Sequence, residues 1–213
     1  MTTELLTAPA EADELPPVTY LDASSNGLEL TPDEFDAIDD YDEEYEYELI
    51  HGVVIVNPIP LEGEVDPNEQ LGFLLREHQQ RHPRGKALDL TLAERYVFLP
   101  SGSRRKADRV IWAGLGRRPQ PKTDIPTIVV EFVSASKRDQ HRDYVIKRRE
   151  YLALGVKEYW VIDRFRGEMS VFRTAEQVTI KRGESYAPPP LPGFVLPFDA
   201  LMAIADRWRD LES

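Results

Sequence analysis

The 213-residue chain contains no cysteine, which excludes disulfides and thiolate metal sites and fits a reducing compartment. No apolar run approaches the roughly 20 residues that cross a bilayer. The first residues, MTTELLTAPAEADELPP, lack the basic start and long apolar core of a signal peptide. A Gly-rich phosphate loop and a G-x-S-x-G motif are also missing. We therefore expect a soluble, cytoplasmic protein without a membrane partner, and nothing favours nucleotide-dependent transfer or serine hydrolysis.

Lysine and arginine are absent from residues 1–70, which hold 20 Asp and Glu. Residues 71–213 hold 26 basic and 18 acidic residues, so their charge is 26 − 18 = +8 and the whole chain carries −12. An asymmetry of this kind is typical of a nucleic-acid-binding domain beside an acidic tail. An ordinary domain with a solvated acidic leader explains the same numbers equally well.

The order of predicted elements indicates an α/β domain over residues 29–213 that follows a disordered acidic leader over residues 1–28. Thr31 and Glu34 form a capping box that opens a short helix, and His51-Gly52 separates the two strands of a β-hairpin. A strand, a helix that Gly155 ends and another strand follow one another over residues 126–163, as in a crossover unit. The remaining predicted elements are a helix over 67–82, strands over 87–93, 95–99, 107–114, 168–173 and 177–183, and an amphipathic helix near the end of the chain.

A glutamate interrupts the most apolar strand, IVVEFV, which spans residues 128–133. A buried carboxylate needs compensation, and either a basic side chain or a metal ion can provide it. Asp108 lies in another apolar strand, and neighbouring strands would bring it close to Glu131. Two adjacent carboxylates favour a bound cation, and oxygen ligands suit Mg²⁺ or Mn²⁺. On spacing alone, the pattern favours an ion pair between Glu131 and an arginine, with Asp108 at the start of a strand near a turn.

Basic residues flank both carboxylates in the sequence. A basic rim around an acidic centre suits a polyanion such as DNA, although a scattered, salt-screened surface gives the same pattern. His78 and His82 stand four apart on a predicted helix, but no third zinc ligand is evident, so solvated histidines are the better interpretation. The candidate DNA-contacting residues are Arg104, Arg105, Lys106, Lys137, Arg138 and Arg142.

Five segments together carry a family resemblance: YELIHG (47–52), ADRVIW (107–112), VVEFVSAS (129–136), DYVIKRREYLALGVKEYWVID (143–163) and LPGF (191–194). In this order they resemble the Uma family of putative restriction endonucleases, within the PD-(D/E)XK nuclease-like superfamily. The resemblance implies a restriction-endonuclease-like fold, in which helices flank a mixed central sheet after an N-terminal helix and β-hairpin. It also implies a Mg²⁺- or Mn²⁺-dependent cut of a phosphodiester in DNA. Many nucleases of this fold are dimers, so a homodimer is a further possibility.

The resemblance assigns roles to four residues. Asp108 and Glu131 match the two metal-binding acids, although Ala107 stands where the family has proline. Val133 occupies the usual lysine position, and Lys147 on the following helix is the matching cation. Glu48 matches the acidic residue of the hairpin, as a further metal ligand or an anchor for water.

Two functions therefore follow from the sequence. The first is a metal-dependent DNA endonuclease. The second is a catalytically inactive nuclease fold that binds nucleic acid or a protein partner, which Val133 at the lysine position favours.

The opposite charges of the two segments predict that the leader docks on the basic part of the domain and competes with DNA at low salt. Deleting residues 1–28 removes Glu4, Glu11, Asp13, Glu14 and Asp22, and should tighten DNA binding. Titration of labelled DNA at low salt measures the effect. Unchanged affinity would contradict the prediction.

Overall fold

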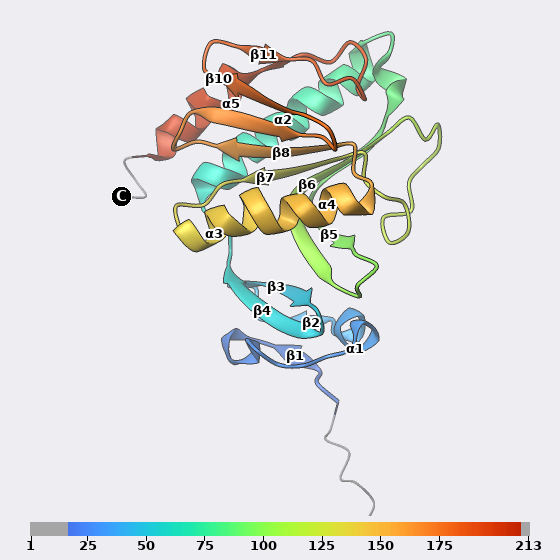
Figure 1. Ribbon diagram of the computed structural model, residues 1–213, viewed down its shortest axis with the longest axis vertical. Coiled ribbons are helices and arrows are strands. Elements are labelled where there is room, and N and C mark those ends of the chain that lie inside the picture. The colour runs from blue at the N-terminus through green and yellow to red at the C-terminus, as the bar shows by residue number, and fades with distance from the viewer. Residues whose placement is uncertain (1–16, 210–213) are drawn as a thin grey trace, which may run out of the picture.

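The computed structural model describes residues 17–209, which form an eight-stranded mixed sheet with helices on both faces and a small N-terminal lobe (Figure 1). The predicted α/β architecture, a mixed central sheet flanked by helices, is confirmed. The lobe spans residues 17–58 and contains β1 (Tyr20–Leu21), η1 (Ala23–Ser25), α1 (Pro32–Ala37), β2 (Asp40–Tyr41), β3 (Tyr45–Ile50) and β4 (Val53–Pro58). The first half of the body contains α2 (Glu62–Arg81), η2 (Gly85–Ala87), β5 (Leu88–Phe98), β6 (Arg104–Ala113) and β7 (Ile128–Phe132). After β7 come α3 (Lys137–His141), the π-helix η3 (Arg142–Lys147), α4 (Arg148–Leu154), β8 (Glu158–Asp163), β9 (Glu168–Phe172), β10 (Gln177–Lys181), β11 (Ser185–Tyr186), β12 (Leu196–Pro197), α5 (Phe198–Ala205) and η4 (Asp206–Trp208).

The strands of the large sheet run in the order β10-β9-β8-β7-β6-β3-β4, and β5 also pairs with β6. Only β7 and β8 pair in parallel within this sheet, and α3, η3 and α4 make the crossover between them. The β3–β4 hairpin turns at His51 and Gly52, whose φ angles of 50° and 81° are both positive, as a type I′ turn requires. The predicted hairpin and crossover unit are therefore present in the fold. In the described residues, no helix is long and apolar enough to cross a bilayer.

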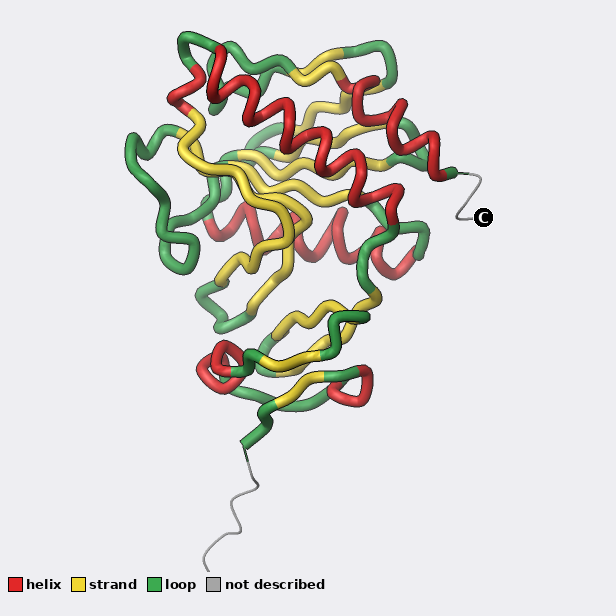
Figure 2. The backbone as a smooth tube through the Cα atoms, turned by 180° about the vertical axis from the view of Figure 1, so that it is seen from behind, coloured by secondary structure: helices red, strands yellow, loops and turns green. Residues whose placement is uncertain are grey.

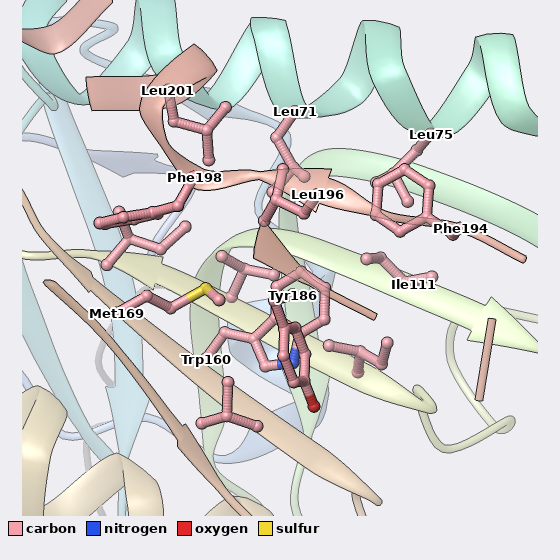
Figure 3. Close-up of a cluster of buried hydrophobic side chains, with 14 of the residues drawn as sticks. Leu71, Leu75, Ile111, Trp160, Met169, Tyr186, Phe194, Leu196, Phe198 and Leu201 are labelled. Carbon is pink, nitrogen blue, oxygen red and sulfur yellow. The ribbon is translucent and has the colours of Figure 1, made fainter. Parts of the chain in front are cut away.

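The alternation of side chains along β7 determines which way Glu131 points. Ile128, Val130 and Phe132 face the core beneath α2 and α5, where they join Trp160 and Leu71 (Figure 3). Val129 and Val133 pack instead in the second core, with Tyr151 of α4. Because successive side chains of a strand face opposite ways, Glu131 points toward η3 and α4. Figure 2 shows α2 and α5 together on the face opposite to these helices.

The N-terminal lobe has a small core of its own, in which Leu21, Phe35, Leu49 and Val54 are buried. Residues 17–28, which we expected to be disordered, instead form β1 and η1. β1 pairs with β2, and the exposed fraction of Leu21 is 3%. The rest of the expected leader, residues 1–16, lies outside the described residues. A deletion that tests leader charge without removing part of this core therefore ends at residue 16.

Two predicted boundaries differ from the structure. Helix α2 begins at Glu62, five residues before the expected Pro67, and the Leu61 N–H donates to Glu64 Oε2 over 3.3 Å at its start. The two strands expected over 87–93 and 95–99 form one strand, β5. Glu94, with a left-handed φ of 49°, is skipped in the pairing with β6, but the register is the same on both sides of it.

Leu71 offers a test of the core beneath α2. It is fully buried in the larger core, so Leu71→Ala should lower the free energy of unfolding by about 2–5 kcal/mol. Phe73 lies on the same helix with 59% of its surface exposed, and Phe73→Ala should change stability by less than about 0.5 kcal/mol. Urea denaturation measures both. Equal losses in the two variants would contradict the packing described here.

Candidate active site

The site forms where one edge of β6 lacks a strand partner. Along this edge β6 pairs with β7 at residues 109–111 and with β3 at Arg104, and no described strand covers residues 105–108 between them. Side chains take the hydrogen bonds that a strand would make. The Lys106 N–H donates to Glu48 Oε1 over 2.9 Å, and Lys147 Nζ donates to the Lys106 carbonyl over 2.9 Å. A pocket of about 260 Å³ opens at this interruption.

Asp108 and Glu131 meet in this pocket. The pairing of Arg109 with Val130, continued by one residue, places Asp108 opposite Glu131 on the adjacent strand. The Phe132 N–H donates to Asp108 Oδ2, which ties the Asp108 carboxylate to the end of β7. Both carboxylates line the pocket, and Glu131 is 2% exposed. The predicted proximity of the two acids is therefore found in the structure.

Lys147 provides the positive charge that the buried carboxylate of Glu131 requires. Its Nζ lies 2.9 Å from Glu131 Oε2 and 3.9 Å from both Glu48 Oε1 and Asp143 Oδ1. Burial lowers the pKa of Lys147, but the three carboxylates outweigh this effect and raise its pKa above the usual lysine value. Lys147 is therefore a permanent cation, and the partner of Glu131 is a lysine rather than the arginine of the alternative interpretation.

The helix that carries Lys147 contains a π-helical segment, η3, which the sequence pattern did not indicate. Such segments are rare and often lie at functional sites. Both Asp143 and Lys147 are buried on η3, and the Tyr159 hydroxyl donates to the Asp143 carbonyl over 3.1 Å. Val133, at the usual lysine position, is fully buried in the second core.

Glu48 supports the pocket from the hairpin. Its carboxylate accepts from the Lys106 N–H through one oxygen and lies 3.4 Å from Arg105 Nη1 through the other. Arg105 also contacts Glu150 of α4 over 2.7 Å. Through these contacts Glu48 connects β3 to β6 and, by way of Arg105, to α4. Its role as a further metal ligand or an anchor for water stays a prediction.

The chemistry of the two facing acids fits a hard divalent cation. Burial raises the pKa of Asp108 and of Glu131 well above the usual carboxyl range, and Glu94 raises that of Asp108 further. Added positive charge is therefore favourable here. Mg²⁺ needs few protein ligands and retains several waters, so two carboxylates suffice. No group of three or more His, Cys, Asp or Glu suited to a metal occurs in residues 17–209.

His78 and His82 do not form the zinc site that their spacing allows. Their rings stack on each other, with centroids 4.8 Å apart, and His78 also packs against Phe194. They contribute to the packing of α2 against the segment that precedes α5.

The expected basic rim is much reduced. Arg105 is 5% exposed and its guanidinium is committed to Glu48 and Glu150, so it cannot reach DNA. Arg104 binds Asp36 through both carboxylate oxygens, and Lys106 lies 2.8 Å from Glu46. Three of the six candidate DNA-contacting residues, Arg104, Arg105 and Lys106, therefore form ion pairs that hold the lobe to β6. Of the other three, Lys137 and Arg138 are exposed, and Arg142 lines the pocket while it binds Asp139 and Asp143.

Three hydroxyl-bearing residues at the site were not singled out from the sequence as site residues. The Tyr151 hydroxyl donates to Glu131 Oε1 over 3.3 Å, so both oxygens of Glu131 have a donor. Ser134 and Ser136 line the pocket directly after β7. The position of the two serines directly after the strand that carries Glu131 could have indicated them. Tyr151 was recognised in the sequence as part of an apolar helical stripe and as the first residue of the family run over residues 151–163, but not as a partner of Glu131.

Comparison with known proteins gives one family match. The model of the family described as "Uma2: Putative restriction endonuclease" matches residues 32–199. The fold is also similar to a crystal structure described as a putative nuclease belonging to DUF820 from Anabaena variabilis. That likeness has a TM-score of 0.66 at 15% sequence identity and covers 83% of this chain and 99% of the other. Among curated proteins, none is significantly similar to this chain.

Removal of the Lys147 charge tests the buried network. Lys147→Met leaves the buried Glu131 without its cation, whereas Glu48 and Asp143 keep Arg105 and Arg142, and should cost about 3–5 kcal/mol of stability near pH 8. Burial raises the pKa of Glu131 and Lys147 opposes this rise, so without Lys147 the pKa of Glu131 lies higher still, and protonation relieves more of the cost in the variant than in wild type. The deficit relative to wild type should therefore shrink as the pH falls toward 5.

The matched control is Lys157→Met, because Lys157 is exposed and has no ion pair within the described residues. Its stability should stay within about 0.5 kcal/mol of wild type. Denaturant unfolding at both pH values measures the two variants. A Lys147→Met deficit that grows as the pH falls, or that equals the control, would contradict this electrostatic role.

Proposed function

Because the chain belongs to the Uma2 family of putative restriction endonucleases, we propose that it is a metal-dependent endonuclease that hydrolyses phosphodiester bonds in DNA by a PD-(D/E)XK-type mechanism. One observation carries the proposal. Asp108, Glu131 and Lys147 converge on one pocket, at the place where the edge of β6 is left without a strand.

Asp108 and Glu131 are the residues that would hold Mg²⁺ or Mn²⁺, because they present facing oxygens in a site where positive charge is favourable. When bound, the ion supplies charge for the phosphate oxygens and acidifies an attacking water. Glu48 keeps the Lys106 backbone and Arg105 in place beside this pair.

Lys147 acts in this proposal as a fixed cation. Because its pKa is raised, it retains its proton and can donate to an oxygen of the phosphate as negative charge develops there. It is therefore unsuited to remove a proton from water. Ser134, Ser136 and Arg142 also line the pocket, where they can donate hydrogen bonds to the phosphate.

One observation favours the second function, a catalytically inactive nuclease fold that binds nucleic acid or a protein partner. Both oxygens of Glu131 already accept hydrogen bonds, from Lys147 and from Tyr151, so an ion must share this carboxylate. Calorimetric titration with Mn²⁺ separates the two functions. An endonuclease should bind the ion in a manner that depends on Asp108, whereas an inactive module should bind it feebly or not at all.

Supercoiled plasmid provides the activity test. With Mg²⁺ or Mn²⁺ the wild-type protein should nick the plasmid, and chelation of the metal should abolish nicking. Asp108→Asn and Glu131→Gln should each lower the rate by at least about 10²-fold, the scale seen when one electrostatic contact to a transition state is lost.

The control for these amide substitutions is Glu77→Gln, because Glu77 is a partly exposed helix carboxylate paired with Arg81 and does not line the pocket. It should cut at the wild-type rate. Cleavage that survives both Asp108→Asn and Glu131→Gln would reject the proposed site, and no cleavage of any DNA by the wild type would favour the inactive module.

A further inference from the structure

A second pocket, of about 290 Å³, adjoins the first. It lies where the N-terminal lobe meets β5 and β6, which reach down to the lobe in Figure 1. Glu46 and Lys106, which form an ion pair with each other, line both pockets, so the two pockets are neighbours along the same part of β6. The first pocket contains the candidate catalytic residues, whereas nothing in the proposed chemistry uses the second.

Aromatic rings make up much of the second pocket's wall. Tyr41 is 50% exposed and packs edge-on against Tyr47, and Phe35 packs edge-on against Tyr96 with the ring centroids 5.8 Å apart. The Tyr96 hydroxyl donates to the Tyr47 carbonyl over 2.8 Å, and the Tyr47 hydroxyl donates to the Asp42 carbonyl over 3.1 Å. These hydrogen bonds hold Tyr47 and Tyr96 in place, so the pocket offers ordered ring surfaces before any ligand arrives.

Glu94 provides a polar group in the same pocket. It adopts a φ of 49°, and its Oε2 atom is buried with no hydrogen-bond partner in the described part of the chain. The nearest cation is Lys106, whose Nζ lies 3.8 Å away and is closer to Glu46. A buried acceptor of this kind is rare and is usually satisfied by water or by a ligand.

The charges around the second pocket favour the base of a nucleotide over its phosphate as the group that binds there. Residues 17–58, which form the lobe side of the pocket, contain 12 Asp and Glu and no Lys or Arg, so they repel phosphate. A nucleobase is neutral, aromatic and edged with donors and acceptors. Arg95 and Lys122 are exposed on the other side and form no ion pair in the described residues, so they can attract the flanking phosphates.

We propose that the second pocket binds an unpaired nucleobase of the strand whose phosphate occupies the first pocket. The inference rests on the proposed function and narrows its substrate to single-stranded or locally unpaired DNA. The base would stack on the exposed face of Tyr41 and place its edge against Glu94. A continuous duplex fits less well, because its second strand would carry phosphates toward the acidic lobe.

Binding can be measured without cleavage, with Ca²⁺ in place of Mg²⁺. The probes are a fluorescein-labelled 15-nucleotide single strand and the duplex of the same sequence, followed by anisotropy with the full-length protein. Wild type should prefer the single strand. Tyr41→Ala should weaken single-strand binding roughly 5- to 150-fold, the range for loss of one stacked base, and should leave duplex binding unchanged. Glu94→Gln should weaken single-strand binding in the same selective way while the ring surfaces remain.

Tyr20→Ala is the matched control, because Tyr20 lies in the same lobe with 46% of its surface exposed and does not line the pocket. It should bind both probes as wild type does, and thermal melting should show all three variants folded. Equal affinity of wild type for the two probes, no binding of the single strand, or equal effects of Tyr41→Ala and Tyr20→Ala would overturn the inference.

Cleavage by the same protein preparations separates this inference from the proposed function. A wild type that nicks plasmid while Tyr41→Ala binds both probes normally would overturn the base pocket alone. A wild type that binds the single strand through Tyr41 but cuts no DNA with Mg²⁺ or Mn²⁺ would overturn the nuclease alone.

Discussion

The buried carboxylate of Glu131 is the constraint on which the site depends. A charge at the centre of a buried strand is costly unless an opposite charge and hydrogen bonds accompany it. Lys147 provides the charge at 2.9 Å and Tyr151 provides a second hydrogen bond. This requirement fixes how the crossover helix packs on the sheet, because the helix must present both side chains to β7. Asp108, on the neighbouring strand, forms no ion pair within residues 17–209, although Lys147 is near enough to lower its pKa.

The carboxylates of Asp108 and Glu131 are accessible from a pocket because, in the described chain, the edge of β6 lacks a strand partner beside residues 105–108. A continuous strand beside residues 105–108 would cover the carboxylates, whereas the separation of β7 from β3 leaves room for a pocket. The β3–β4 hairpin closes one side through Glu48, and the acidic lobe continues from it. The pocket of the candidate active site and the aromatic pocket therefore both arise from the sheet topology, and Lys106 lines both.

The sequence predicted the features that follow from local pattern. The hairpin turn, the crossover unit and the meeting of Asp108, Glu131 and Lys147 came from residue alternation and from family motifs, and all are found. Burial of individual charges depends on tertiary partners, and so the sequence did not reveal that Arg105 lies inside an ion-pair network. The left-handed φ of Glu94 and the π-helix around Lys147 are likewise invisible in periodicity, because both are local departures from regular structure that packing imposes.

Anomalous diffraction from crystals soaked in Mn²⁺ tests the central claim most directly, because it locates the ion rather than its effect. The account predicts an anomalous peak between the carboxylates of Asp108 and Glu131, with Lys147 still beside Glu131. A peak elsewhere, or none at a Mn²⁺ concentration that saturates binding in solution, would contradict it.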